Sequence, residues 1–273
     1  MTARWTPRQR AMLAEMGLRV WEAVPADQAS GAESLAEAPR ATAANEDPTL
    51  PAPAGAAQFE ARRSVAPRPS RPSGERPPGI ATMDWVALRA AVAACTACGL
   101  CASRTNTVFG CGHQEAHWMV VGEAPGEQED LRGEPFVGKS GQLLDNMLRA
   151  LRLTRDAATA ERQVYIANTL KCRPPGNRNP EPGELAMCEP FLIRQIELVR
   201  PAIILAMGRF AVQALLRSSE PIGRLRGQVH RYHDVPMVVT YHPAYLLRNP
   251  QDKARAWEDL CLARAVAAGA DQR

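Results

Sequence analysis

Three polar side chains stand just beyond apolar runs that are typical of buried strands: Glu123, Asn168 and His242. A carboxylate can position or activate water, an amide offers both a donor and an acceptor, and an imidazole can donate a hydrogen bond while neutral. In an open α/β sheet, ligands bind beyond the carboxyl ends of the strands. We therefore expect the three side chains to converge on one crevice.

Cysteines form the second chemical feature. The chain has seven of them and no export signal, which favours metal or cluster ligation over disulfides. One candidate set combines a CxxC pair with two distant thiols, and a rival set is entirely local. Spacing alone chooses neither between the sets nor between zinc and an iron–sulfur cluster, because both accept four thiolates. The two sets are Cys95, Cys98, Cys172 and Cys188, or Cys95, Cys98, Cys101 and Cys111.

The elements that must position these residues follow from hydrophobic periodicity. Short apolar runs alternate with segments whose apolar residues recur at helical spacing, and the connections are short. This order predicts an α/β fold whose central, mostly parallel, four-stranded sheet is covered by helices on both faces. The predicted strands are 118–121, 164–167, 202–207 and 237–240.

Between the first strand and its helix lies a segment rich in glycine and charge. Gly122, Ala124 and Gly126 belong to a tight turn. The acidic run 127–130 is interpreted as a solvated loop that orders this turn. Phe136 follows, and a helix is expected after the small residues 138–141.

The amino-terminal part of the chain does not resemble a hydrophobic core. Residues 1–26 predict a short helix, which is either a docking segment for a protein partner or a marginal helix without a partner. Residues 27–82 are rich in Ala, Pro and Arg and predict a disordered linker. The folded domain is expected over 83–273, where Asp84 would cap a first helix with Trp85, Leu88 and Val92 inside and Val86 as a further candidate for this inner side.

Composition limits the kinds of partner. The net charge is only +4, and the cations are nearly all arginine, so a nucleic-acid surface would be a local patch. No apolar run approaches the ~20 residues that a membrane span requires. These features predict a cytoplasmic protein with no membrane association, and we expect a monomer.

Four motifs together resemble the family 4 uracil-DNA glycosylases, the iron–sulfur members of their superfamily. They occur in the family's order between Cys95 and Trp257, and read GEAPGEQED, GEPFVGKSGQLL, VYIANTLKCRPPGNR and HPAYLLRNP. The resemblance implies a three-layer α/β/α fold. It also implies a [4Fe–4S] cluster on the thiols that match the family pattern, Cys95, Cys98, Cys172 and Cys188. A related branch that crosslinks to DNA carries a basic insertion after the second strand, which this chain lacks.

The resemblance further implies roles around a uracil base that has been flipped out of DNA. His242 would hydrogen-bond a carbonyl oxygen of the departing uracil, and the Asn168 amide would match uracil O4 and N3–H. Phe136 would stack on the base. Backbone groups of Gly122, Ala124 and Gly126 would help to place the base or the water. Glu123 would position or activate that water.

The same resemblance assigns DNA contacts. Leu246 or Leu247 would wedge into the gap left by the extruded nucleotide, while Arg248 contacts a phosphate. Further phosphate contacts are expected from Lys139, Ser140 and Arg173. The expected partner is uracil-containing DNA, single- or double-stranded.

The sequence thus predicts a monofunctional uracil-DNA glycosylase of bacterial type that acts in base-excision repair. In the best-known branch of the superfamily, a water-activating Asp follows the position of Glu123, and here that residue is Ala124. The alternative is therefore a non-catalytic iron–sulfur protein that recognises uracil or damaged DNA. A nucleotide-binding redox protein is a weaker rival, because the chain has neither a GxGxxG nor a Walker motif.

Overall fold

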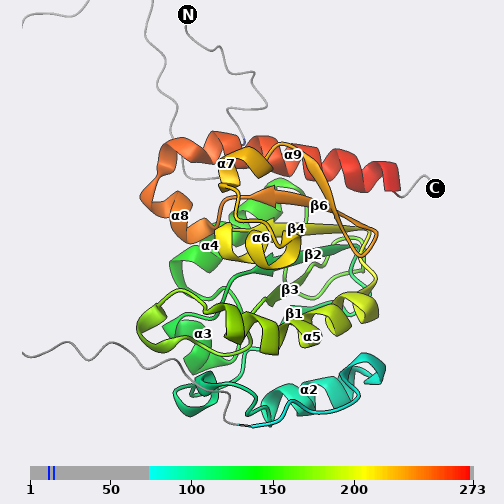
Figure 1. Ribbon diagram of the computed structural model, residues 1–273. Coiled ribbons are helices and arrows are strands. Elements are labelled where there is room, and N and C mark those ends of the chain that lie inside the picture. The colour runs from blue at the N-terminus through cyan, green and yellow to red at the C-terminus, as the bar shows by residue number, and fades with distance from the viewer. Residues whose placement is uncertain (1–11, 13–14, 16–73, 271–273) are drawn as a thin grey trace, which may run out of the picture. The chain divides into compact units, whose positions relative to one another are not determined.

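The apolar run that begins at Trp118 forms β2 (Trp118–Gly122), a strand in which every residue is buried. β2 lies near the middle of the sheet in the computed structural model, which describes Met12, Glu15 and residues 74–270 (Figure 1). Within these residues the sheet has six strands in the order β1-β3-β2-β4-β6-β5. The other strands are β1 (Cys111–Gly112), β3 (Tyr165–Asn168), β4 (Ile203–Met207), β5 (Val229–Tyr232) and β6 (Val235–Thr240).

The four central strands are parallel, as the sequence predicted, and the prediction missed the two edges. β1 and β5 are both antiparallel to their neighbours. β1 has only two residues, and three of the four residues of β5 are at least partly exposed, so neither produces an apolar run. The predicted strand number of four is therefore corrected to six, while the predicted fold class is confirmed.

Helices cover both faces of the sheet, which makes the three-layer α/β/α arrangement (Figure 1). Side chains of β2 alternate between the two sides: Val120 belongs to one apolar cluster, and Met119 and Val121 belong to another. The first cluster includes residues of α4 (Gly138–Ala150), α8 (Pro243–Arg248) and α9 (Lys253–Ala270). The second includes residues of α5 (Pro182–Val199), α6 (Arg209–Leu216) and α7 (Ile222–Leu225).

The acidic run after the first strand is a helix, so the expectation of a solvated loop is wrong. It forms α3 (Glu127–Arg132), whose carboxylates brace the surrounding chain. The Glu129 carboxylate accepts backbone N–H bonds from Gly126 at 3.0 Å and Val137 at 2.9 Å. Asp130 is buried and accepts from the Thr105 N–H at 2.9 Å. Hydrogen bonds to a charged carboxylate are among the stronger hydrogen bonds in proteins.

Ordered structure begins before residue 83. Ile80, in the 3₁₀ turn η2 (Ile80–Thr82), is buried together with Leu88 of α2 (Trp85–Ala93). The domain therefore includes residues that the sequence assigned to the linker. Val86 is 79 % exposed and does not face the core. The remaining short turns are η3 (Gly99–Ala102), η4 (Pro175–Asn177) and η5 (Pro250–Asp252).

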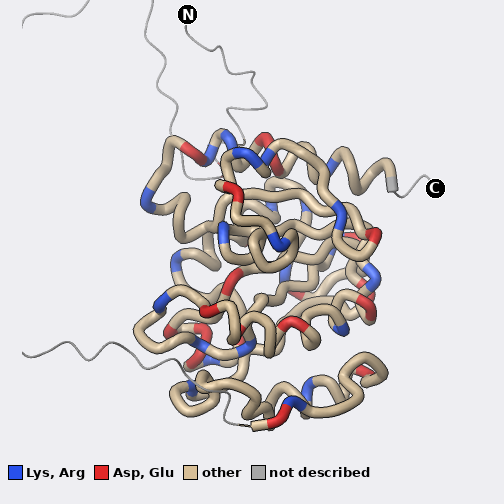
Figure 2. Tube along the Cα trace, in the orientation of Figure 1, with Lys and Arg blue, Asp and Glu red and all other residues tan. Residues whose placement is uncertain are grey.

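The predicted amino-terminal helix and most of the linker lie outside the described residues, except that Met12 and Glu15 are helical. No helix in the described part of the chain is long and apolar enough to span a membrane. Figure 2 shows basic and acidic residues interspersed along the described trace.

The predicted N-terminal cap of α2 is present, and its contribution to stability can be tested. The Ala87 N–H donates to the Asp84 carboxylate at 2.8 Å. Replacing Asp84→Ala should lower the free energy of unfolding by about 1 kcal/mol, because one N–H of the first helical turn loses its acceptor. Urea unfolding followed by circular dichroism measures the change. Gln142→Ala, at an exposed position of α4, is the control and should stay within about 0.5 kcal/mol of wild type.

Candidate active site

The site lies at the carboxyl edge of the parallel strands. The chain passes from β2 to β3 on one side and then crosses to β4 on the other side of β2, which creates a switch in strand order. A cleft of about 710 Å³ opens there. Eight of the predicted residues line it, so the expected convergence is observed: Glu123, Ala124, Gly126, Phe136, Ser140, Asn168, His242 and Arg248.

His242 is held as a neutral donor. It precedes α8, and its Nδ1 accepts the backbone N–H of Ala244 at 3.1 Å. Burial, reinforced by the positive charge of Arg248, lowers the pKa of His242 to about 4. The ring is therefore neutral near pH 7, and because Nδ1 is an acceptor, Nε2 carries the proton. This nitrogen can donate a hydrogen bond to a ligand in the cleft.

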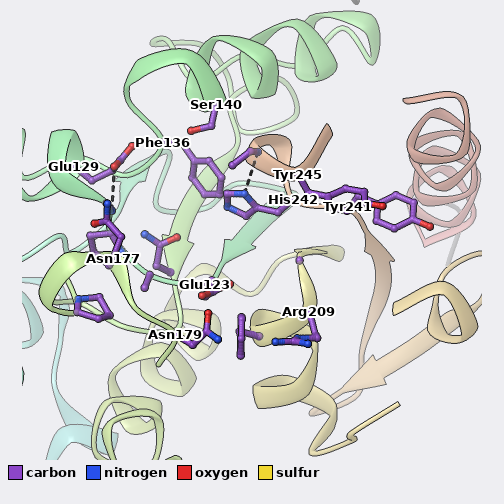
Figure 3. A pocket seen from close by; sticks show the side chains of 18 of the residues that line it. Glu123, Glu129, Phe136, Ser140, Asn177, Asn179, Arg209, Tyr241, His242 and Tyr245 are labelled. Carbon is purple, nitrogen blue, oxygen red and sulfur yellow. Dashed lines mark hydrogen bonds between the residues drawn. The ribbon is translucent and has the colours of Figure 1, made fainter. Parts of the chain in front are cut away.

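Phe136 lies beside this imidazole. The two rings stack with centroids 5.3 Å apart and planes 25° from parallel (Figure 3). The Phe136 backbone has a φ of 55°, a left-handed conformation that costs energy for a residue other than glycine. Arg155 compensates from behind: its guanidinium donates to the Phe136 carbonyl at 2.9 Å and forms an ion pair with Asp145. The surrounding structure thus fixes the ring against His242.

Asn168 is 2 % exposed at the end of β3, opposite Gly122 of β2. Among the described residues, none hydrogen-bonds its side-chain amide, although the Lys171 ammonium binds its backbone carbonyl. Because Asn168 lines the cleft and no protein group takes up its amide, this side chain is available to a polar ligand. Gly122 is not a lining residue, but it leaves the space in which Asn168 and Phe136 approach β2.

Glu123 follows Gly122 directly and points into the cleft with Arg209 nearby (Figure 3). Burial raises the pKa of Glu123 to about 7, and the charge of Arg209 opposes that shift in part. Its backbone is fixed, since the Glu123 carbonyl accepts the Leu170 N–H at 3.1 Å. A carboxylate with this pKa can accept a proton near neutral pH.

Only some of the residues predicted to contact DNA line the cleft. Ser140 and Arg248 line the cleft, while Lys139 is exposed in the first turn of α4. Arg173 lies outside the cleft lining, and its guanidinium donates to Asn177 at 2.7 Å and pairs with the exposed Glu127. These contacts tie Arg173 to its own loop and to α3.

Leu246 and Leu247 differ in how much of each side chain is exposed. Leu246 is 0 % exposed within the large apolar cluster, so of the two leucines predicted as the wedge it is the one that packs in the core. Leu247 is 45 % exposed and remains available. The one-residue difference follows from the 3.6-residue period of α8, which turns adjacent side chains to different sides.

Several lining residues were not singled out from the sequence. Asn177 and Asn179 lie within the motif GNRNP, and Tyr241 and Tyr245 flank His242, so their motifs could have indicated them. Others come from α6 and α7, where no motif marks them, and include Arg209, Phe210 and Ile222.

Four cysteines from two distant segments gather around a second, smaller cavity. Cys95, Cys98, Cys172 and Cys188 all line it, together with Cys101. Two cationic side chains lie there as well, Arg104 and Lys171. Arg104 donates to the Cys172 sulfur at 3.2 Å, and the Lys171 backbone N–H donates to the Cys188 sulfur at 3.3 Å.

Cys111 lies elsewhere, in β1 opposite Ile166, so the local set of four cysteines is not brought together. Among the described residues, no group of three or more His, Cys, Asp or Glu side chains surrounds a single metal-ion position. A four-iron cluster takes one thiolate on each iron, and its ligands therefore surround a volume. Thiolates that line a cavity suit such a group.

Comparisons with known proteins agree with this geometry. A family model described as the uracil DNA glycosylase superfamily matches residues 109–261. A type-4 uracil-DNA glycosylase of Archaeoglobus fulgidus is 42 % identical over 168 residues, which cover 59 % of this chain and 81 % of that protein. A type-4 uracil-DNA glycosylase of Thermotoga maritima is 42 % identical over 163 residues, covering 59 % and 82 %. A type-5 uracil-DNA glycosylase of Pyrobaculum aerophilum is 32 % identical over 148 residues, covering 50 % and 64 %.

The contrast between the two adjacent leucines of α8 can be tested by stability alone. Leu246→Ala should lower the free energy of unfolding by about 2–5 kcal/mol, because it leaves a cavity in the core. Leu247→Ala should change it by less than about 0.5 kcal/mol. Thermal and urea unfolding of both variants measure the difference. Equal losses in the two variants would contradict the placement of Leu246.

Proposed function

The chain belongs to the uracil DNA glycosylase superfamily, and we propose that it is a monofunctional uracil-DNA glycosylase of DNA repair. It hydrolyses the bond between C1′ of deoxyribose and N1 of uracil and leaves an abasic site. The observation that carries this proposal is the cleft itself. A neutral imidazole donor, an amide without a protein partner and an aromatic ring face one space, and a carboxylate stands beside them.

The base side of the cleft stabilises the departing uracil. Bond cleavage places positive charge on the sugar and negative charge on the base, so a donor aimed at a uracil carbonyl oxygen strengthens its bond as the reaction proceeds. His242 supplies this donor through Nε2–H. Because burial keeps the ring neutral, no proton must first be removed or gained near pH 7.

Asn168 discriminates uracil from cytosine in this proposal. Its amide N–H₂ donates to uracil O4, and its carbonyl oxygen accepts from N3–H. Cytosine presents the reverse pattern, which would leave buried polar groups unpaired. Phe136 offers a face on which the flipped base stacks.

Glu123 acts on the sugar side, where it positions the attacking water and accepts its proton. Ala124 carries no polar group, so Glu123 is the catalytic carboxylate in this proposal. Glu129 also lines the cleft, but both of its oxygens already accept backbone N–H bonds.

DNA is held around the cleft mouth by exposed side chains. Leu247 replaces Leu246 as the proposed wedge, since it is the exposed member of the pair. Arg248 and Ser140 contact phosphates next to the flipped nucleotide, and Lys139 contacts one farther along the strand. Arg173 contributes mainly by keeping its loop in place. None of the described lysines lines the cleft, so the proposal includes no Schiff-base lyase step.

A [4Fe–4S] cluster is proposed on Cys95, Cys98, Cys172 and Cys188. The fit rests on the donor set, on the cavity that the four thiols line, and on the N–H donors beside two of the sulfurs. Cationic Arg104 and Lys171 also suit a group whose thiolates bring negative charge. When bound, the cluster ties the segment before β1 to the loop after β3. We assign it no step in the hydrolysis.

The activity makes the first functional prediction. An oligonucleotide with one central uracil should yield an abasic site, which hot alkali converts into a strand break. Asn168→Ala and His242→Ala should each lower the rate at least tenfold, because each removes a partner of the base. Tyr232→Phe is the matched control, since that hydroxyl has no partner in the described structure and lies outside the cleft. No product from wild-type protein that retains its cluster would favour the non-catalytic DNA-binding alternative.

Glu123 makes a pH prediction. Because its pKa is raised to about 7, the active carboxylate form is depleted below that pH and predominates above it. The value of kcat/KM should therefore rise with pH and level off above about 7. His242, with a pKa of about 4, should add no step between pH 5 and 9. Glu123→Gln should be slower and lose the rise near pH 7, and an unchanged pH profile in that variant would exclude Glu123 as the base.

A further inference from the structure

Lys171 is a buried cation that the proposed chemistry does not use. Its side chain is 1 % exposed, and its ammonium donates to the Asn168 carbonyl at 2.8 Å and to the Gln195 side-chain oxygen at 2.6 Å. Gln195 is fully buried on α5 and donates in turn to the Phe109 carbonyl at 2.8 Å. The ammonium thus joins the end of β3 to α5 through two buried acceptors.

The backbone of the same residue belongs to the cysteine site. Lys171 immediately precedes Cys172, and its N–H donates to the Cys188 sulfur at 3.3 Å. Its carbonyl accepts the Val108 N–H at 2.8 Å. One residue thus contacts two proposed cluster ligands through its main chain and the backbone of the cleft residue Asn168 through its side chain.

A buried ammonium is costly unless negative charge lies close to it. No carboxylate hydrogen-bonds Lys171 in the described structure, and its polar side-chain partners are two neutral oxygens. Cys172 and Cys188 lie close to the ammonium, and they supply negative charge there when they bind a cluster as thiolates. A cluster at this site therefore accounts for a lysine at a position where an apolar side chain would otherwise be expected.

The contact with Asn168 fixes one specific peptide group. The peptide between Asn168 and Thr169 is held on both sides, because the Thr169 N–H donates to the Gly122 carbonyl at 3.0 Å and the Asn168 carbonyl accepts from Lys171. If the lysine contact is lost, this carbonyl is buried without its partner, and the end of β3 loses one of the two contacts that anchor it. The Asn168 side chain projects from that backbone, so its position in the cleft becomes less well defined.

We propose that Lys171 is a positioning residue for Asn168. Through this contact, the structure of the cysteine site affects base recognition in the cleft. The inference rests on the proposed role of Asn168 and deepens it. The cysteine site then supports catalysis through a defined contact and not only by stabilising the fold.

The test compares two variants of similar size. Lys171→Met removes the contact with the Asn168 carbonyl, whereas Gln195→Met keeps that contact and removes the other acceptor of the lysine, together with the Gln195 bonds to Phe109 and Tyr165. Single-turnover cleavage of the uracil oligonucleotide should fall at least tenfold in Lys171→Met and less than threefold in Gln195→Met. Iron content and the visible absorbance of the cluster are measured on each preparation.

A double-mutant cycle separates positioning from general damage. In the Asn168→Ala background, Lys171→Met should lower the residual rate less than twofold, because the side chain that it orients is already absent. The same tenfold loss in both backgrounds would overturn the inference. Loss of iron from Lys171→Met alone would also overturn it, since the lysine would then serve cluster retention.

Binding provides a readout that does not need turnover. Oligonucleotides with 2′-fluorinated deoxyuridine or deoxycytidine resist cleavage, and Lys171→Met should lose most of the wild-type preference for the uracil form. Unchanged preference would contradict the proposal. If Lys171→Met does not fold, Lys171→Gln, which lacks the charge and is shorter, replaces it in every arm. Inactive wild-type protein would refute the glycosylase function itself, whereas active wild type with an additive cycle would refute only the role of Lys171.

Discussion

The absence of a side chain at Gly122 is the constraint on which the cleft depends. A Cβ atom there would lie 2.5 Å from both the Asn168 side-chain oxygen and the edge of the Phe136 ring. Both groups can therefore approach the end of β2 only because this residue is glycine. Phe136 in turn stacks against His242, whose own Cβ lies close to Gly208 at the end of β4. Two glycines at neighbouring strand ends thus allow three functional side chains to share one space.

Burial in this space acts in opposite directions on its acid and its base. It disfavours the charged form of each group, so it lowers the pKa of His242 to about 4 and raises that of Glu123 to about 7. The first shift maintains a neutral donor for the departing base. The second produces a proton acceptor matched to neutral pH. One physical cause, removal of water from the carboxyl edge of the sheet, gives both groups the protonation behaviour that the proposed hydrolysis requires.

The loop after β3 connects this cleft with the cysteines. Asn168, the last residue of β3, faces the cleft, and Cys172, four positions later in this loop, lines the second cavity. Lys171 lies between them, and its side chain points back to the Asn168 carbonyl. Helix α5 completes the arrangement, because it carries both Cys188 and Gln195. The proposed cluster and the base-recognition residue are therefore neighbours in three dimensions as well as in sequence, with a short and fully buried path between them.

The sequence by itself determined the parallel core, the three polar residues at strand ends and the family, because each depends on local periodicity or on contiguous motifs. It also indicated the four cysteines through their resemblance to the family pattern. Tertiary structure alone decided which cysteines meet, that Leu247 and not Leu246 is exposed, and that two edge strands complete the sheet. The protonation of His242 and Glu123 was equally undetermined, since burial arises from segments far apart in the chain. Such contacts leave no periodic signal in either partner, so only the folded chain reveals them.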